Sequence, residues 1–229
     1  MSAARISVVM SVRDGASFLA DAIDSVLGQT RPPDEVIVVD DGSNDATPAI
    51  LARYAGRLRV ERRPPIGYAA ALNHGLSRAS GDLVAFQDAD DLWMPRKLEL
   101  QLAALGERSD VDAVGGHVEQ FLTIGAATSG RRFTFDPGPL PGVTLPCLLL
   151  RRSLVEQSGP LDEAFGTAAA LDWIARISGS TEVLVLAEVV LRRRIHGENV
   201  SVTAREHRDR ALLRVLRHHR RRNRPNAPR

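Results

Sequence analysis

Three carboxylates stand close together directly after a short apolar run. The run from Leu83 to Phe86 is typical of a buried strand, and Asp88, Asp90 and Asp91 follow it within five residues. Acidic groups beside a buried strand are costly unless a cation compensates them. Open α/β sheets bind their ligands beyond the carboxyl ends of the strands, so the cluster predicts a divalent metal site at such an end. The alternative is a helix N-terminus, where acids are favoured by the helix dipole.

A second acidic turn, Asp40-Asp41-Gly42-Ser43, follows another apolar run. Its carboxylates could accept hydrogen bonds from a nucleobase or from ribose hydroxyls, and the alternative is a tight turn that uses Gly42 at positive φ. The chain contains neither a G-x-G-x-x-G pattern at this place nor a G-x-x-x-x-G-K-[ST] pattern anywhere. A dinucleotide-binding enzyme or a P-loop NTPase is therefore not expected.

Two later residues could also take part in chemistry. Asp172 stands near the start of an expected helix, where it could act as a general base or only as a helix cap. His196 follows an apolar strand and could bind a metal or a diphosphate, although a lone histidine is more often structural. The residues alone leave both alternatives open.

These side chains need a scaffold, and the hydrophobic pattern predicts one. Apolar runs of strand length alternate with helix-period segments, which indicates an α/β fold with a mostly parallel sheet flanked by helices. The expected strands lie at 6–12, 35–39, 58–61, 83–86, 111–121, 132–135, 183–186 and 189–195, with a further strand and helix within 145–157. The expected helices lie at 17–29, around 47–54, at 68–79, after Pro95 and near 171–178.

Composition narrows the class of protein. The 229 residues are 44% hydrophobic and 4% aromatic, so an ordinary globular domain is expected and an aromatic surface for nucleic acid is not. The single cysteine, Cys147, lies in an apolar run and is expected to be buried and inert. Because no apolar stretch reaches the roughly 18 residues that span a bilayer, we expect a cytoplasmic protein.

The C-terminal segment differs sharply from the rest. Residues 204–229 contain ten arginines and two acids, which gives +8, whereas residues 1–203 contain 20 cations and 26 acids, which gives −6. We therefore expect one domain over 1–203 and a basic helix or tail over 204–229. The tail could contact anionic lipid at the membrane surface, remain solvated, or dock on the domain through its leucines.

Five motifs in order resemble a family 2 glycosyltransferase of the GT-A type, of the kind found in bacteria, over nearly all of residues 5–203. The motifs are Ile6 to Gly15, Val36 to Ser43, Gly67 to Gly75, Phe86 to Trp93, and Arg194-Ile195-His196 with Asn199 and Ser201. The resemblance implies transfer of a sugar, with inversion, from a nucleotide-diphosphate sugar, most often a uridine one, to an acceptor hydroxyl. The acceptor stays open, as a glycan, a lipid-linked sugar, a peptide or a small molecule.

The resemblance also implies roles for individual residues. Asp90, with His196, would bind Mg²⁺ or Mn²⁺ across the diphosphate, and Asp172 would be the catalytic base. Contacts to the nucleotide sugar would come from Ser11, Arg13, Asp40, Asp41, Gly67, Asn73, Asp88 and Ala89.

The sequence departs from the family pattern at three positions. Arg13 replaces a tyrosine that stacks on the base, Leu72 replaces an arginine before Asn73, and Leu171 replaces an acid before Asp172. The last two departures keep a second hypothesis open, a nucleotide-sugar-binding protein without activity. A nucleotidyltransferase is a weaker third, because Arg13-Asp14-Gly15 is a poor match to a phosphate-binding loop.

Overall fold

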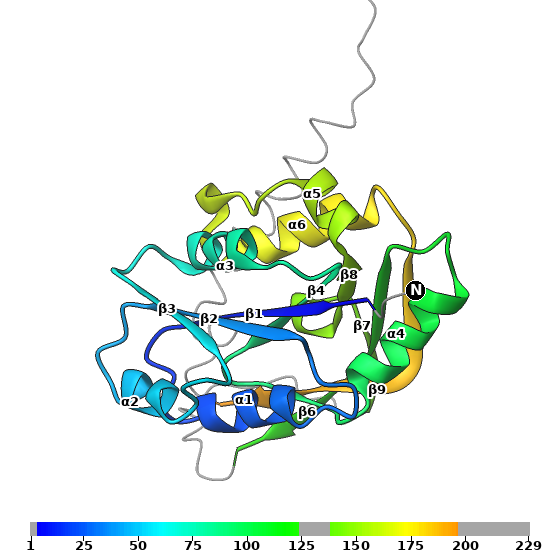
Figure 1. The fold of residues 1–229 in the computed structure, drawn as a ribbon. Helices are drawn as coiled ribbons and strands as arrows, with labels where there is room; N and C mark the ends of the chain where they lie inside the picture. The colour runs from blue at the N-terminus through cyan, green and yellow to red at the C-terminus, as the bar shows by residue number, and fades with distance from the viewer. Residues whose placement is uncertain (1–3, 124–137, 197–229) are drawn as a thin grey trace, which may run out of the picture.

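The computed structural model describes residues 4–123 and 138–196, which form one mixed α/β domain (Figure 1). The expected strand at 132–135 and the basic segment 204–229 lie outside the described residues. The helices are α1 (Leu19–Leu27), α2 (Thr47–Ala52), α3 (Tyr68–Arg78), α4 (Lys97–Glu107), α5 (Arg152–Ser158) and α6 (Ala169–Ser178), with 3₁₀ turns η1 (Leu145–Cys147) and η2 (Glu163–Ala168). The strands are β1 (Ile6–Val12), β2 (Glu35–Asp41), β3 (Arg59–Arg63), β4 (Leu83–Asp88), β5 (Leu92–Trp93), β6 (Ala113–Leu122), β7 (Leu140–Gly142), β8 (Leu149–Arg151) and β9 (Val183–Ile195).

The strands form one sheet in the order β3-β2-β1-β4-β8-β6-β9-β5, with β7 paired to β6. The first four strands in this order are parallel, as the alternation of strands and helices predicts. The second half is mixed, because β8 runs antiparallel to both β4 and β6 while β9 runs parallel to β6. The parallel half brings the carboxyl ends of β1, β2 and β4 to one edge, where the acidic turns lie.

Helices cover both faces of the sheet, with α3, α5 and α6 on one side and α1 and α2 on the other (Figure 1). Successive residues of β1 therefore face different cores: Val8 and Met10 pack in the cluster that includes α1 and α4, and Val9 packs in the cluster that includes α3 and α6. Burial on both faces explains why the parallel strands are continuous apolar runs rather than alternating ones.

The last strand differs from the sequence prediction. Two strands were expected, at 183–186 and 189–195, and the structure has a single strand, β9, across both. Exposed Ala187 and Glu188 stay extended, and the pairing with β6 shifts register between Gly115 and His117. This β-bulge accommodates Ala187 and Glu188 within one continuous strand, so no turn divides β9.

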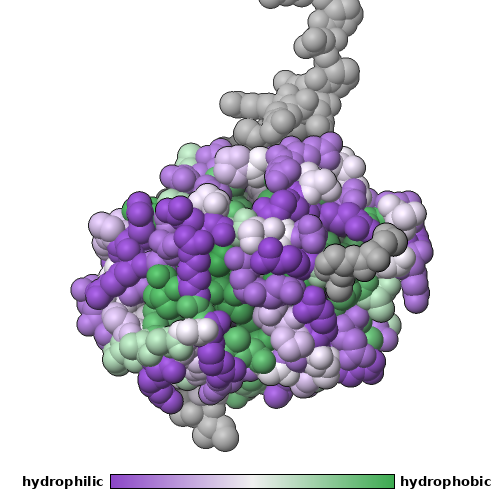
Figure 2. Space-filling model, viewed as in Figure 1, coloured by the Kyte–Doolittle hydropathy of each residue, from purple (hydrophilic) through white to green (hydrophobic). Residues whose placement is uncertain are grey.

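The surface is mainly hydrophilic, with an apolar patch over β2 and β3 (Figure 2). The patch borders an open hollow of about 420 Å³ between α2 and β3, whose lining includes Leu51, Leu58 and Val60 together with Asp40 and Arg62. Among the described helices, none is long and apolar enough to cross a membrane.

Candidate active site

Strand register places the predicted site residues at one edge of the sheet. In the parallel ladders, Val12 pairs with Asp40 on one side, and Ser11 pairs with Asp88 on the other. Asp40 and Asp88 therefore stand two strands apart, roughly 10 Å, with the end of β1 between them. The structure thus places both acids at the carboxyl ends of parallel strands, as the sequence predicts for Asp88.

The acid cluster after β4 is compact. One carboxylate oxygen each from Asp88, Asp90 and Asp91 lies within 4.8 Å of the other two. Asp88 and Asp90 are partly exposed, whereas Asp91 is buried and accepts a 2.9 Å hydrogen bond from the backbone N–H of Arg194. Asp91 is thus already engaged in holding the loop, which leaves Asp88 and Asp90 as the carboxylates that face outward.

Crowding and burial change the acidity of this cluster. Burial, followed by the charge of Asp90, raises the pKa of Asp88 from 3.8 to about 7. Burial also raises the pKa of Asp91 well above its usual value, and the charges of Asp90 and Asp88 add to the effect. Three like charges in a desolvated site are unfavourable without a cation. Their hard oxygen donors therefore fit Mg²⁺ or Mn²⁺.

The end of β9 lies beside this cluster. Nε2 of His196 lies 3.1 Å from Oδ2 of Asp90, and the His196 ring packs on Phe18 with 4.5 Å between ring centroids. The structure therefore brings His196 to Asp90, as the expected metal site requires. A histidine nitrogen, if it bound a metal, would suit Mn²⁺ better than Mg²⁺.

The turns after β1 and β2 are joined by hydrogen bonds. The backbone N–H groups of Asp14 and Gly15 donate to the hydroxyls of Ser43 and Thr47, both at 2.9 Å. Asp14 has a φ of 50°, and its carboxylate accepts from the N–H of Asn44 at 2.7 Å. These bonds fix the approach to the sheet edge, while the neighbouring Arg13 side chain remains 53% exposed.

The two acids of β2 are buried and hydrogen-bonded. Asp41 accepts from the backbone N–H groups of Ile66 and Gly67 at 2.6 and 3.0 Å. This fixes the segment before α3, where Gly67 has a φ of 94° that a side chain would strain. Asp40 accepts from the N–H of Ser43 at 2.9 Å, and its other oxygen lies 3.5 Å from Nε of Arg62.

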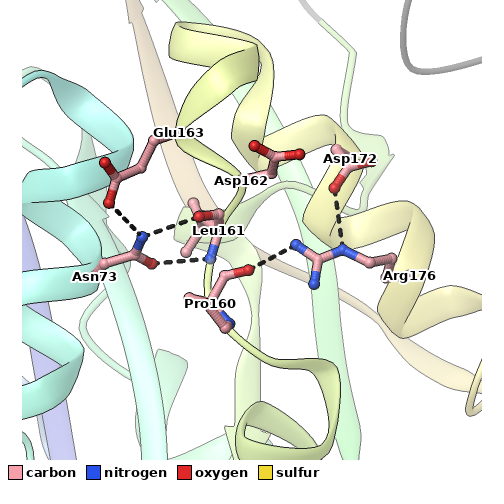
Figure 3. Close-up of a pocket in the computed structure, with 7 residues that line it drawn as sticks. All are labelled: Asn73, Pro160, Leu161, Asp162, Glu163, Asp172 and Arg176. Atoms are coloured by element: carbon pink, nitrogen blue, oxygen red, sulfur yellow. Dashed lines mark hydrogen bonds and ion pairs between the residues drawn. The ribbon is translucent and has the colours of Figure 1, made fainter. Parts of the chain in front are cut away.

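Asp172 and Asn73 share a cavity whose lining does not include the acids of the cluster. Both line an open cavity of about 670 Å³ between α3, α6 and the segment 160–163 (Figure 3). Asp172 is 2% exposed, and its carboxylate lies 3.0 Å from Nε of Arg176. Figure 3 shows the Arg176 guanidinium pointing from α6 toward Pro160, whose carbonyl it binds at 2.9 Å.

The side chain of Asn73 holds the backbone of Leu161 through two hydrogen bonds. Its side chain donates to the carbonyl of Leu161 at 2.9 Å and accepts from the N–H of the same residue at 2.8 Å. Arg176 also donates to the carbonyl of Ser158. The polar groups in this cavity therefore tie α3 and α6 to the segment that joins α5 to η2.

Two residues near the cluster were not singled out in the sequence. Tyr68, the first residue of α3, has its pKa raised well above 10 by burial and by the charges of Asp88, Asp90 and Asp91. The charge of Arg193 opposes the rise in the pKa of Asp88. An aromatic residue after Gly67 and a second arginine before His196 were the available signals, but neither has a spacing that indicates chemistry.

Comparison with known sequences gives consistent matches. Residues 7–159 match the family described as glycosyl transferase family 2. An uncharacterised glycosyltransferase of Nostoc sp. is 31% identical over 221 residues, covering 87% of this chain and 67% of that protein. The putative glycosyltransferase EpsE of Bacillus subtilis is 39% identical over 119 residues, covering 50% of this chain and 43% of that protein.

Comparison with solved structures gives matches along most of the chain. A mannosyltransferase of Pyrobaculum calidifontis, solved in complex with GDP-Man and Mn²⁺, has a TM-score of 0.71 at 21% identity, covering all of this chain and 67% of that one. Residues 1–349 of TarS from S. aureus, solved in complex with UDP, have a TM-score of 0.66 at 20% identity, covering 85% of this chain and 61% of that one.

Proposed function

The chain belongs to glycosyltransferase family 2 and has the GT-A fold, and from this premise we propose that it transfers a sugar from a nucleotide-diphosphate donor to an acceptor hydroxyl, with inversion. The chain spans two thirds or less of the length of the relatives described above. The donor, the acceptor and the metal are therefore parts of the proposal.

The observation that supports the proposal most is the contact between the acid cluster and the end of β9. Asp88, Asp90 and Asp91 bring one carboxylate oxygen each within 4.8 Å of one another, and His196, about a hundred residues later, places Nε2 3.1 Å from Oδ2 of Asp90. We propose that they hold Mn²⁺ or Mg²⁺, which agrees with the Mn²⁺ in the mannosyltransferase of similar fold. A cation there would supply positive charge against the departing diphosphate.

The residues around the cation would position the donor. The solved structures of similar fold include complexes with UDP, UDP-GlcNAc and GDP-Man. In this chain the nucleoside would lie at the ends of β1 and β2, beside Arg13 and Asp40, and the diphosphate would point to Asp88 and Asp90. The mutual hydrogen bonds of the two turns keep this surface rigid, which lowers the entropy cost of placing the donor.

The general base is assigned on the resemblance rather than on geometry. An inverting displacement needs a base that removes the proton of the attacking hydroxyl. Asp172 is our proposed base, yet its carboxylate is buried and paired with Arg176. The pair with Arg176 uses Oδ2 of Asp172, and the acceptor hydroxyl would reach the carboxylate through the cavity that contains Asn73 and Glu163.

Ligand-dependent thermal shift tests the proposal. UDP-, dTDP- and GDP-sugars are added to the full chain with Mn²⁺ and, separately, with a chelator. A ligand that binds only the folded state raises the melting temperature according to its concentration and affinity. We expect at least one donor to stabilise the protein with Mn²⁺, and the effect to disappear with chelator or in Asp90→Asn.

Measurement of nucleoside diphosphate released from that donor completes the test. Slow release, accelerated by an acceptor, is expected of a transferase. Binding without release would identify a binding protein, and no binding of any donor would overturn the proposal.

A further inference from the structure

Arg194 contacts several separate parts of the chain at the site: the acid loop, Phe18 and Asp21 near the start of α1, and Phe121 on β6. It lies on β9 two residues before His196, on the same face of the strand because side chains alternate with a period of two. Its side chain is 9% exposed. A buried guanidinium requires specific partners, and the partners of Arg194 identify its role.

The first set of partners is the loop that carries the acids. The backbone N–H of Arg194 donates to Oδ1 of Asp91 at 2.9 Å, and Nε of its guanidinium donates to the carbonyl of Asp90 at 2.9 Å. One bond fixes the side chain of Asp91, and the other fixes the backbone of Asp90. Neither of these two bonds uses a carboxylate oxygen of Asp88 or Asp90, so both act on the conformation of the loop.

The second set of partners holds the guanidinium itself. It lies between the rings of Phe18 and Phe121, 4.7 and 4.9 Å from their centroids, and its terminal nitrogen pairs with Asp21 on α1 at 3.0 Å. Stacking on two aromatic faces together with directed hydrogen bonds restricts a planar guanidinium in a way that an ammonium cannot reproduce. The group is therefore fixed before any ligand arrives.

We propose that Arg194 is the positioning residue of the metal site: it sets the place of Asp90 and Asp91 so that the cluster is preformed for a divalent cation. This inference rests on the proposed function for the identity of the ligand. The ordering of the loop by Arg194 does not require a metal and can be measured in the metal-free chain. The claim that Arg194 orders the loop and the claim that the loop binds a divalent cation can therefore be tested separately.

Charge and position predict opposite effects of removing Arg194. If it acted only as a nearby positive charge, its removal would strengthen cation binding, because a like charge would be gone. If it positions the loop, its removal weakens cation binding, as loss of outer groups around metal ligands does, by about 10-fold to 100-fold. The sign of the change in Mn²⁺ affinity therefore decides between the two.

The matched control is Arg192→Met. Arg192 lies on the same face of the same strand, stacks on Phe121 at 4.7 Å and pairs with Glu119 at 3.2 Å, and no hydrogen bond to the acid loop is found among its contacts in the described residues. The change removes one arginine side chain and one stacking contact. The backbone of Arg192 pairs with Leu92 on β5, and that pairing does not depend on the side chain. Arg194→Lys keeps the charge and serves as a second variant if Arg194→Met folds poorly.

Two measurements on the full chain test the proposal. The first is Mn²⁺ affinity by calorimetry, where we expect Arg194→Met to bind about 10-fold or more weakly, Arg194→Lys to bind more weakly than the unmodified chain, and Arg192→Met to be unchanged. The second is hydrogen exchange of the metal-free protein over residues 88–93, where we expect faster exchange in both Arg194 variants only.

The outcomes separate the claims. Unchanged exchange in this loop, or unchanged or tighter Mn²⁺ binding in the Arg194 variants, would overturn the positioning role. Faster exchange in a chain that binds no Mn²⁺ even when unmodified would retain the positioning role and remove the proposed metal.

Discussion

The carboxylate of Asp172 and the guanidinium of Arg176 lie 3.0 Å apart on successive turns of α6, and the guanidinium also binds the carbonyls of Ser158 and Pro160. This pair fixes the path of the chain from α5 to η2. The residue proposed as the base thus has a structural role in the same cavity, and the two roles predict different kinetics.

Asp172→Asn and Arg176→Met separate the two roles. Each change breaks a buried ion pair, so each should lower the free energy of unfolding by roughly 3 kcal/mol, measured by urea denaturation. If Asp172 is the base, Asp172→Asn should also lower the transfer rate at least about 100-fold more than Arg176→Met does. Equal losses of rate in the two variants would remove the base assignment.

His196 should contribute directly to metal affinity. Because Nε2 lies 3.1 Å from Oδ2 of Asp90, His196→Gln should weaken Mn²⁺ binding about 10-fold, measured by calorimetry. His74→Gln is the control, because His74 contacts Glu61 at 3.4 Å and not an acid of the cluster. Equal Mn²⁺ affinity in both variants would place His196 outside the site.

Asp41 should stabilise the fold more than it contributes to chemistry. It accepts two backbone N–H groups before α3, and hydrogen bonds to a charged group are each worth roughly 1.5–3 kcal/mol. Asp41→Asn should therefore lower the free energy of unfolding by about 2 kcal/mol. The exposed Asp110→Asn, which loses only a surface pair with Arg108, should change it by less than about 0.5 kcal/mol. Similar values for the two variants would contradict this role.

Lys97, the only lysine of the chain, should make stability depend on pH. It is fully buried beside the Trp93 ring and donates to Gln101 at 2.7 Å, and burial lowers its pKa from 10.5 to about 7. Between about pH 7 and 10.5 the unfolded chain binds the proton and the folded chain does not, so this group makes stability rise with pH across that window.

Urea denaturation of the unmodified chain and of Lys97→Met at pH 6.5, 8 and 9.5 measures the effect. The unmodified chain should gain stability relative to Lys97→Met as the pH rises, by several kcal/mol in total. Parallel pH profiles for the two proteins would show that Lys97 does not titrate in this range.

Much of the parallel half of the sheet follows from sequence. Continuous apolar runs such as Val36–Val39 can be buried only on both faces of a sheet, and an acid directly after such a run must emerge at its carboxyl edge. The positions of Asp40 and Asp88 at the ends of β2 and β4 could be predicted on this ground. Helix α5 ends at Gly159, whose φ of 68° explains the need for glycine there.

What the sequence did not predict depends on contacts distant along the chain. The continuity of β9 across Glu188 depends on a bulge opposite β6, and the binding of Arg194 to Asp90 and Asp21 depends on the fold of the whole domain. The Asp172–Arg176 pair did have a local signal, an i,i+4 spacing of opposite charges. Its significance appears only once α6 is seen to face the segment 158–160.

The rate of donor cleavage by metal-free and metal-restored protein tests the central claim most directly. With a donor identified by thermal shift, release of nucleoside diphosphate is measured after chelation and again after addition of Mn²⁺, for the unmodified chain and for Asp90→Asn. We predict that Mn²⁺ restores release only in the unmodified chain, while Asp90→Asn stays inactive but folded. Equal rates in the chelated and Mn²⁺-loaded unmodified protein would contradict the account.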